Sequence, residues 1–422
     1  MSIQQPGKEQ RSLLSSQSSL LILFILALAL RIFCAFYGPT MMEYIFSDMK
    51  GYISIADQVL SGIWKVTHFF QSIGYPMVIA FLKRFFDNWS MPLGILQALL
   101  SFLTLIPIYL LSERCFGKKT AMIALLIASV HVPWVLFSNL ALPETIFTFC
   151  LSLSAWFSFK LISEEKPSLL YAFGWAIFFM MAFWLKGTHV FWAPLFLTGM
   201  LIYRKKAALP AVILISVTMA LSLSLHGWLT HSKIGKIQLS ASTGGLNFIE
   251  GKCPLKDNKD SLSYSWISPL YYQLDMQKQK LWDRPFTDSS YFMQQGFKCI
   301  QANPFILVQS LESIPFLFFG NLTWPLNQMP KHEAIRLYEL YFSIFLLCGF
   351  LLFARQMATN RDLKHFLIWG LPVMALFLCV YIFKSEVRYR IPFDIWLIPM
   401  AVQGLRNLRI TYFDEEPASH IS

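Results

Sequence analysis

The chain has 422 residues, of which 55% are hydrophobic and 14% are charged. Soluble domains carry about 25% charged residues, so this composition excludes an ordinary soluble protein and predicts an all-α polytopic membrane protein. The net charge of +11 does not indicate a nucleic-acid partner. Most Lys and Arg residues lie in short clusters between apolar segments, as in the cytoplasmic loops of membrane proteins.

The first ninety residues contain one predicted span and a mixed loop. Residues 1–19 are polar and are expected to form a disordered cytoplasmic tail. Leu20–Tyr37 is apolar, is long enough to span a bilayer and lacks a small-residue cleavage site, so we predict an uncleaved first span. Residues 38–90 mix charged and aromatic residues, which is typical of helices that lie in the membrane interface.

Nine further apolar segments bring the expected number of transmembrane helices to about ten, with both termini in the cytoplasm. A polar insert, residues 226–303, interrupts them and is expected outside the membrane. The next segment, Phe305–Trp324, contains Glu312 and Asn321, so we predict an interfacial or re-entrant segment. The nine predicted spans are Pro92–Leu111, Thr120–Phe137, Leu142–Phe159, Leu169–Leu185, Val190–Tyr203, Leu209–Leu225, Ile335–Phe353, His365–Phe383 and Ile391–Leu405.

This pattern divides the chain into five parts. They are a cytoplasmic tail (1–19), an N-terminal transmembrane module with the first outer loop (20–225), an extracytoplasmic insert with the interfacial or re-entrant segment (226–334), C-terminal transmembrane helices (335–409) and a second cytoplasmic tail (410–422). The basic clusters at 114–119, 160–166, 204–206, 355–364 and 406–409 then all face the cytoplasm. An alternative with about twelve spans puts three of these clusters outside and is disfavoured.

Cysteine and histidine spacing indicates no metal site. The seven Cys residues form no Cys-x-x-Cys pair, and Cys253 and Cys299 lie in the polar insert. The sequence leaves open whether these two residues form a disulfide or remain two free thiols. His68, His131 and His189 lack the spacing of metal ligands, so we predict no metal held by the protein alone.

Asp48 follows closely on the first apolar segment. An ionisable group so near a bilayer is a functional candidate. Alternatively, Asp48 caps a helix, because Ile53, Ala56 and Leu60 follow at helical spacing.

Other charged residues fall on the same outer side of the predicted topology. Long basic side chains at helix ends can reach the lipid headgroups, which is the structural explanation for any one of them. Taken together, the set favours a site in which Lys and Arg bind a phosphate and a carboxylate acts as general base. The outer charges are Glu43, Asp48, His68, Glu144, Lys186, Lys384, Glu386, Arg388 and Arg390.

Five short motifs resemble the GT-C class of integral-membrane glycosyltransferases, notably the aminoarabinose lipid A transferase and protein O-mannosyltransferase group. Their order and their placement against the spans cover nearly the whole chain. The motifs are Asp48-x-x-x-Tyr52-x-x-x-Ala56, Gly74-Tyr75-Pro76, Leu142-Pro143-Glu144-Thr145, Thr243-Gly244-Gly245-x-Asn247-Phe248 and Arg388-Tyr389-Arg390-x-Pro392.

The resemblance implies a polyprenyl-phosphate-linked sugar as donor and a lipid, glycan or protein as acceptor, at the outer face of what would be a bacterial inner membrane. Asp48 and Glu144 match the catalytic acids. Protein mannosyltransferases carry an Asp-Glu pair where this chain has Asp48 and Met49, so a lipid or glycan acceptor is as well supported as a protein. The remaining implied roles are donor-phosphate binding by Lys186, Lys384, Arg388 and Arg390, and substrate binding by Glu43, Tyr52, His68, Tyr75 and Asn247.

Two adjacent glycines before Asn247 allow close backbone approach, and the Asn247 amide can bond a sugar hydroxyl; an ordinary turn is the alternative. No cofactor is firmly predicted, and a divalent cation between the donor phosphate and the carboxylates is left open. A transporter or flippase for lipid-linked saccharides would use the same charges as a binding track. The absence of an internal repeat and the long outer insert disfavour that alternative, and a non-catalytic scaffold would leave the outer charges unexplained.

Overall fold

The computed structural model describes residues 8–38, 42–43, 45, 48–253, 288–320 and 332–413. Every regular element in these residues is helical, which confirms the predicted all-α fold class. The elements of the first half are α1 (Lys8–Tyr37), α2 (Asp48–Leu60), η1 (Val66–Phe69), α3 (Gly74–Phe85), α4 (Ser90–Leu103), α5 (Leu105–Phe116), α6 (Lys118–Ser129), α7 (Val132–Phe137), α8 (Glu144–Ser163), α9 (Leu169–Leu185), α10 (Trp192–Arg204), η2 (Lys205–Ala208) and α11 (Leu209–Ile234). They are followed by α12 (Thr243–Lys252), α16 (Ser289–Ala302), α17 (Ile306–Gln309), η3 (Ser310–Glu312), α18 (Ser313–Phe319), α19 (His332–Asn360), α20 (Leu363–His365), η5 (Phe366–Gly370), α21 (Leu371–Ile382), α22 (Val387–Arg390), η6 (Ile391–Phe393) and α23 (Asp394–Phe413).

The chain is an integral, polytopic membrane protein by the length and hydropathy of its helices. Within the described residues, six helical segments are long and apolar enough to cross a membrane. A seventh is added if the pair α16 and Ile306–Phe319, bent by 112°, is counted as one broken span. The predicted total of about ten spans stays a prediction. The six segments are Gln17–Tyr37, Ser90–Phe116, Glu144–Ser163, Trp192–Ile234, His332–Asn360 and Leu363–Ile382.

Several helix boundaries differ from the sequence prediction. The first helix begins at Lys8 rather than Leu20. The predicted span Thr120–Phe137 is broken into α6 and α7 at His131, because Pro133 cannot donate a backbone hydrogen bond and so starts a new helix. Helix α11 continues to Ile234, where Gly235 ends it in the left-handed conformation (φ +70°) that glycine adopts without strain.

Parts of the predicted domains fall outside the described residues. These parts are residues 1–7 of the first tail, 39–41, 44 and 46–47 of the first outer loop, 254–287 of the polar insert, 321–331 at and beyond the end of the re-entrant segment, and 414–422 of the second tail. The domain division is therefore still a prediction.

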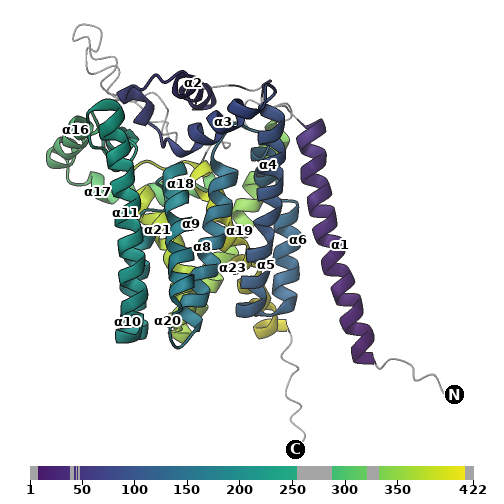
Figure 1. The fold of residues 1–422 in the computed structure, drawn as a ribbon. Helices are drawn as coiled ribbons and strands as arrows, with labels where there is room; N and C mark the ends of the chain where they lie inside the picture. The colour runs from purple at the N-terminus through teal and green to yellow at the C-terminus, as the bar shows by residue number, and fades with distance from the viewer. Residues whose placement is uncertain are drawn as a thin grey trace, which may run out of the picture.

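Most of the predicted site residues lie by one end of the bundle, which we call the loop face and which is formed by α2, α3, α12 and α16. In Figure 1, α2, α3 and α16 lie across the upper end of the bundle, while α1 begins and α23 ends towards the opposite end. Backbone hydrogen bonds from Ser242 to Phe69 and from Thr243 to Phe70 attach the start of α12 to the first loop. Two segments far apart in the chain thus form one layer over the bundle.

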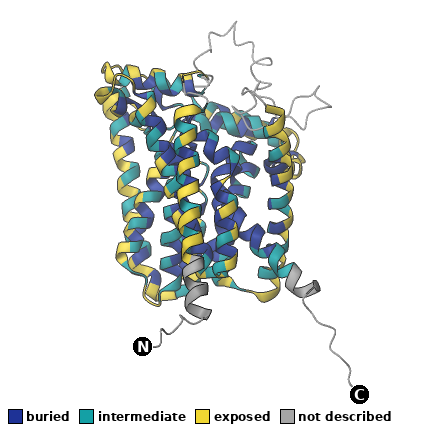
Figure 2. Ribbon diagram, turned by 90° about the vertical axis from the view of Figure 1, so that its right-hand side faces the viewer, coloured by how far each residue is buried: buried dark blue, intermediate teal, exposed yellow. Residues whose placement is uncertain are grey.

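The burial pattern is that of a helical bundle in lipid. Figure 2 shows buried residues along the inner faces of the helices and exposed residues on the outside. Exposed apolar side chains such as Leu21 on α1 and Leu221 on α11 point outward, as expected for a lipid-facing surface. Inside the bundle the rings of Trp192 and Trp396 meet edge to face at 5.1 Å and join α10 to α23.

Helix α1 is held by a buried arginine that sequence reasoning did not single out. Arg31 is fully buried and donates hydrogen bonds to Ser101 Oγ at 2.9 Å, to Ser129 O at 2.9 Å and to Ala128 O at 3.3 Å. The two carbonyls lie at the C-terminus of α6, where a helix presents partial negative charge. Arg31 therefore caps α6 and fixes α1, which leads into the first loop.

Candidate active site

Four segments far apart in the sequence bring charged side chains together by the loop face. Asp48 begins α2, Glu144 begins α8, Lys186 follows α9 and Arg388 lies on α22. Each residue stands at a helix end, where the chain leaves the bundle. The sequence placed all four on one side of the membrane, and the structure brings them into contact.

Arg388 lies between the carboxylates of this cluster. Its Nη2 atom is 3.2 Å from Asp48 Oδ2, and its Nε atom is 3.4 Å from Glu144 Oε1 and 3.7 Å from Glu386 Oε2. Burial lowers the pKa of the Arg388 guanidinium, but the carboxylates of Glu144, Asp48 and Glu386 outweigh that effect and hold the pKa above its usual range. The side chain is therefore a permanent cation at the centre of the site.

Glu144 and Lys186 form the second ion pair of the cluster. Lys186 Nζ is 2.8 Å from Glu144 Oε1, and the Glu144 side chain is only 2% exposed. The Lys186 ammonium also lies 5.0 Å from the centre of the Tyr389 ring, a cation–π distance. Glu144 is thus shared between Lys186 and Arg388.

Asp48 is the more accessible of the two carboxylates that were predicted to be catalytic. Its side chain is 16% exposed, and Oδ1 accepts a hydrogen bond from Gln71 Nε2 at 2.7 Å. Helix α2 begins at Asp48, as predicted. The carboxylate of Asp48 therefore faces Gln71 and Arg388 from the first turn of the helix.

A further carboxylate, Glu250, reaches the cluster from α12 and was not predicted. Lys384 Nζ lies 2.8 Å from Glu250 Oε2 and 3.1 Å from Glu386 Oε1. Burial raises the pKa of Glu250. Burial alone would lower the pKa of Lys384, but the carboxylates of Glu386 and Glu250 outweigh this effect, so the pKa of Lys384 is raised. Helix α12 can lie this close to the end of α21 only with glycine at position 251, because a Cβ there would lie 2.3 Å from the carbonyl oxygen of Phe383.

Two predicted substrate-binding tyrosines form a buried aromatic floor beside the cluster. The rings of Tyr52 and Tyr75 meet edge to face at 5.3 Å. The Tyr75 hydroxyl donates a hydrogen bond to Gln97 Oε1 at 3.0 Å, and Gln97 in turn donates to Ser138 O and Leu140 O. The network ties the first loop to the segment that leads into Glu144.

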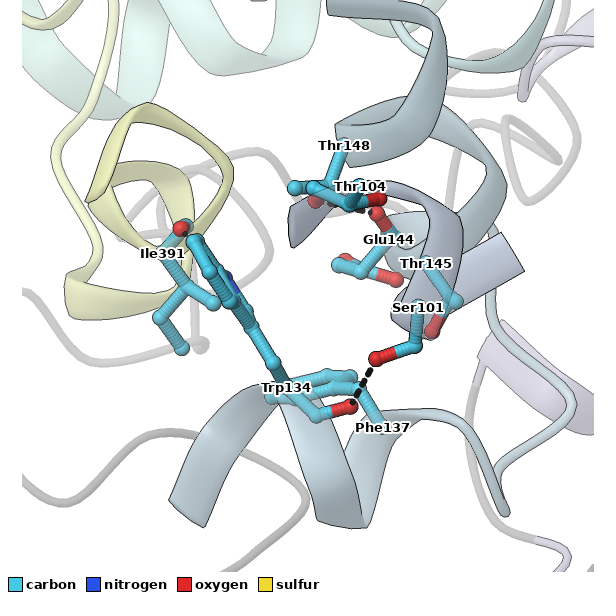
Figure 3. Close-up of a pocket in the computed structure, with 8 residues that line it drawn as sticks. All are labelled: Ser101, Thr104, Trp134, Phe137, Glu144, Thr145, Thr148 and Ile391. Atoms are coloured by element: carbon cyan, nitrogen blue, oxygen red, sulfur yellow. Dashed lines mark hydrogen bonds between the residues drawn. The ribbon is translucent and has the colours of Figure 1, made fainter. Parts of the chain in front are cut away.

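A small cavity lies next to Glu144 (Figure 3). It encloses about 10 Å³, which is space for roughly one water molecule and too little for a sugar. Two polar atoms beside the cavity, Glu144 Oε2 and Thr145 Oγ1, find no hydrogen-bond partner in the described part of the chain. The cavity is lined by Ser101, Thr104, Trp134, Phe137, Glu144, Thr145, Thr148 and Ile391.

The other predicted site residues lie in different surroundings. Arg390 points into a second group of buried charges and makes no ion pair with Asp48 or Glu144 in the described part of the chain. His68 is buried within the first loop, where its Nε2 lies 3.0 Å from Gln58 Oε1 and its Nδ1 accepts a hydrogen bond from the backbone N–H of Lys65. Burial lowers the pKa of His68, and the positive charge of Lys65 lowers it further. Glu43 is exposed and Asn247 is half-buried on α12.

The described residues contain no group of three or more His, Cys, Asp or Glu side chains arranged to hold a metal ion. Asp48 and Glu144 nevertheless converge, since both lie within ion-pair distance of Arg388. Two carboxylates and a bound phosphate could together supply oxygen ligands to a divalent cation, and these two are the residues that would do so.

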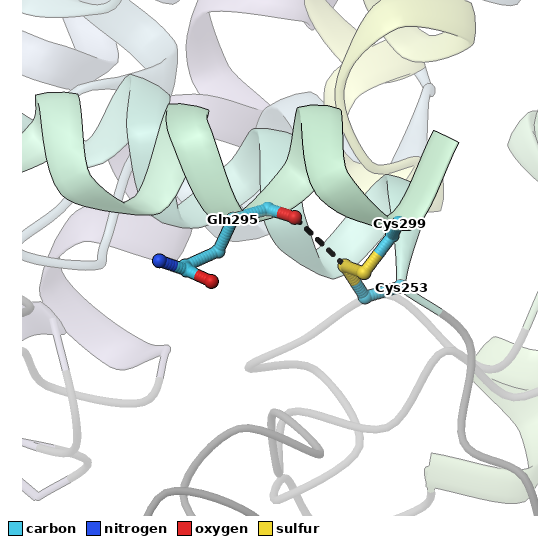
Figure 4. Close-up of a disulfide and its surroundings, with 3 residues drawn as sticks. All are labelled: Cys253, Gln295 and Cys299. Carbon is cyan, nitrogen blue, oxygen red and sulfur yellow. Dashed lines mark hydrogen bonds between the residues drawn. A yellow bond between two sulfur atoms is a disulfide. The ribbon is translucent and has the colours of Figure 1, made fainter. Parts of the chain in front are cut away.

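Helices α12 and α16 are joined by a disulfide between Cys253 and Cys299 (Figure 4). The sequence left this pairing open. The Sγ of Cys253 also lies 3.9 Å from Gln295 O. The bond fixes α12, and with it Glu250, against α16.

Comparison with known proteins adds a family match to this geometry. Residues 71–228 match the family described as dolichyl-phosphate-mannose-protein mannosyltransferase. The chain resembles the GT-C class of integral-membrane glycosyltransferases. This confirms the resemblance that the sequence motifs indicated. The matched segment includes Glu144 and Lys186 of the charged cluster, whereas Asp48 and Arg388 lie outside it.

Three solved structures align with most of this chain at low identity. A structure of the Archaeoglobus fulgidus oligosaccharyltransferase tethered to an acceptor peptide has a TM-score of 0.50 at 15% identity, and the alignment covers 94% of this chain and 50% of that one. The oligosaccharyltransferase AglB of the same organism, in complex with an inhibitory peptide and a dolichol-phosphate, gives 0.49 at 14% identity, with 94% and 50% covered. ArnT from Cupriavidus metallidurans bound to undecaprenyl phosphate gives 0.35 at 12% identity, with 96% and 80% covered.

This chain spans about half the length of the archaeal oligosaccharyltransferase. At such low identity the likeness concerns the fold. No curated protein matches the sequence significantly.

Proposed function

We propose that the protein is a glycosyltransferase that moves a sugar from a polyprenyl-phosphate donor to a lipid, glycan or protein acceptor. The observation that carries the proposal is the contact of Asp48, Arg388, Glu144 and Lys186. A carboxylate that can take a proton stands beside two cations that can bind a phosphate. The match to a family that uses a dolichyl-phosphate-linked sugar supports the same donor chemistry.

In the proposed reaction Asp48 accepts the proton of the acceptor hydroxyl. The freed oxygen lone pair forms a bond to the anomeric carbon of the donor sugar, on the face opposite the phosphate. The bond between that carbon and the phosphate oxygen breaks, its electron pair stays on the oxygen, and polyprenyl phosphate leaves. One displacement of this kind inverts the anomeric configuration.

Arg388 and Lys186 stabilise the charge that develops on the departing phosphate. Cations fixed in a water-poor site act strongly on such charge because they need no reorganisation during the reaction. Glu144 is nearly inaccessible and is shared by both cations, so its proposed role is to hold them in place. Lys384 lies two ion pairs beyond Arg388, through Glu386, and would extend the phosphate site towards α12.

The charge balance of the cluster leaves room for a divalent cation. Three cations (Lys186, Lys384 and Arg388) face four carboxylates (Asp48, Glu144, Glu250 and Glu386), so the net charge is 3 − 4 = −1 before an anionic phosphate arrives. A phosphodiester donor adds a second negative charge, and a divalent cation held by Asp48 and Glu144 would neutralise both.

We also propose that the loop face is extracytoplasmic and that the protein resides in a bacterial inner membrane. One of the basic clusters predicted to be cytoplasmic, residues 406–409, belongs to the C-terminal part of α23. This helix ends on the side of the bundle opposite the loop face. Disulfides form in oxidising compartments, and Cys253–Cys299 lies in the layer at the loop face. Both features support the same orientation.

The proposal is tested by incubating purified protein with labelled polyprenyl-phosphate sugars and a cell-envelope extract. A glycosyltransferase transfers label to an acceptor, and Asp48→Asn slows the transfer by roughly 10²–10⁴. A second arm uses protein in sealed vesicles with the donor on one side. Movement of intact donor across the bilayer, with no label transferred, would instead identify a flippase.

A further inference from the structure

The short helix α22 carries two arginines that point in different directions. Consecutive residues of a helix are about 100° apart around its axis, so residues two positions apart lie on nearly opposite sides. Arg388 contacts Asp48 and Glu144, as described above. Arg390 is fully buried and contacts a separate set of residues, on α19 and α23.

This second set contacts the Arg390 guanidinium through three of its nitrogen atoms. Nη2 is 3.1 Å from Glu339 Oε2, Nε is 3.2 Å from Asp394 Oδ1, and Nη1 donates to Ser343 Oγ at 2.6 Å. Both carboxylates are buried. The three contacts use three different nitrogen atoms of the fork, which a lysine could not reproduce.

His131 closes the network from the break between α6 and α7. Its Nε2 lies 3.1 Å from Asp394 Oδ2, and its Nδ1 lies 2.9 Å from the Tyr338 hydroxyl. The side chain is fully buried. Next to it, Trp134 Nε1 donates a hydrogen bond to Ile391 O at 3.0 Å and holds the backbone immediately after Arg390.

These contacts make little sense as a source of stability alone. Burying an ion pair gains little over apolar packing, since the charges must first be stripped of water. Buried polar networks can instead define one arrangement of the backbone. Here the arrangement so defined is that of α22, which places Arg388.

We propose that Arg390, with Glu339, Asp394 and His131, is a positioning device that sets Arg388 between Asp48 and Glu144. Arg390 then acts through Arg388 and makes no contact with the donor phosphate, contrary to the role suggested by its sequence motif. When the inference is tested by donor binding, it rests on the proposed function. When it is tested by the energetic coupling between Asp48 and Arg388, it rests on the geometry alone.

The experiment is a double-mutant cycle with a short-chain polyprenyl phosphate as the bound probe. Arg390→Met and the milder Glu339→Gln are each made in the wild-type and Arg388→Ala backgrounds. Glu333→Gln, an exposed position on the same helix as Glu339, is the matched control. We expect about tenfold weaker binding in the wild-type background, comparable to the loss of one charge-assisted hydrogen bond, and less than twofold further loss in the Arg388→Ala background.

Equal losses in both backgrounds would overturn the proposal, because Arg390 would then bind the phosphate itself. Unchanged binding in folded Arg390→Met and Glu339→Gln proteins would also overturn it. Glu339→Gln keeps the shape and an oxygen acceptor for Arg390, so it provides a folded variant if Arg390→Met fails to fold.

A second cycle needs no donor. Asp48→Asn and Arg388→Met are combined, and their coupling is measured from the unfolding temperature, once in the otherwise wild-type chain and once in the Glu339→Gln background. Coupling that disappears in the Glu339→Gln background supports the positioning role, and coupling that persists contradicts it. If wild-type protein fails to bind polyprenyl phosphate, the proposed function fails while this cycle still decides the inference.

Discussion

Arg388 Nη2 lies 3.2 Å from Asp48 Oδ2, although 340 positions separate the two residues in the chain. In the proposed reaction these side chains are the phosphate ligand and the general base. While they are paired, the guanidinium occupies the Asp48 oxygen that faces it. A donor phosphate that competes for Arg388 would loosen the pair and leave this oxygen free for the acceptor hydroxyl. The geometry therefore favours donor binding before proton transfer.

The first prediction concerns the donor affinity of Arg388 variants. Arg388→Ala should weaken binding of a polyprenyl phosphate by about 1.5–3 kcal/mol, the usual contribution of a hydrogen bond to a charged group. Arg388→Lys should recover only part of this loss, because the fork geometry is absent. Binding can be followed by titration of detergent-solubilised protein, with the unfolding temperature measured in parallel.

Arg336→Ala provides the matched control, since Arg336 is exposed on α19 and pairs only with the exposed Glu333 among the described residues. Its donor affinity should equal that of the wild type. Arg388 would be a structural residue if its Ala variant bound donor normally but unfolded at a clearly lower temperature.

The convergence of Asp48, Glu144, Lys186 and Arg388 could be predicted because topology alone restricts all four to one face of a thin layer. The direction of Arg390 could not, because it depends on whether residues 387–390 are helical. In an extended segment, residues two positions apart share a face, whereas in a helix they nearly oppose each other. Glu250 was missed because it lies in a polar insert without periodicity, and only the fold brings α12 to Lys384.

The second prediction concerns pH and Lys252, on α12. Lys252 is buried, donates to Ser310 Oγ at 2.6 Å and to Tyr381 O, and burial lowers its pKa to about 8. An unfolded lysine has a pKa of about 10.4, so between about pH 8 and pH 10.4 the unfolded state binds more protons than the folded state. The contribution of Lys252 to stability should therefore rise with pH across that window.

Thermal unfolding of wild type and Lys252→Met, from pH 7 to pH 10, measures this effect. The wild-type unfolding temperature should rise relative to that of the variant as the pH increases. Lys298→Met is the control for the loss of a lysine side chain, because Lys298 is exposed on the neighbouring helix α16. A constant difference for Lys252→Met would show that its ammonium is not destabilised by burial.

The third prediction concerns orientation. Ser61 is exposed in the first loop, and Asn360 is exposed at the end of α19. Single cysteines at these positions, in a background with the exposed Cys348 replaced by Ser, should react differently with a membrane-impermeant maleimide. Ser61→Cys should be labelled in intact spheroplasts, and Asn360→Cys only after permeabilisation. The reverse pattern would place the loop face in the cytoplasm.

The last prediction concerns the base. Asn retains the size of Asp and caps helices about as well, so Asp48→Asn should leave α2 intact and remove only the proton acceptor. Turnover should fall by roughly 10²–10⁴, the usual contribution of a positioned general base. Donor binding should persist, because Lys186 and Arg388 remain. Label transfer, donor titration and unfolding temperature are measured on the same preparation.

Asp57→Asn is the matched control, since Asp57 lies on the same helix but is 56% exposed and pairs with Lys83. An exposed ion pair of this kind contributes about 0–1 kcal/mol, so Asp57→Asn should be nearly silent. A capping role for Asp48 predicts a different pattern: Asp48→Asn would turn over normally, while Asp48→Ala would lose about 1 kcal/mol of stability. An Asp48→Asn protein that folds, binds donor and transfers sugar at the wild-type rate would remove Asp48 from the chemistry and leave Glu144 or Glu43 as the candidate base.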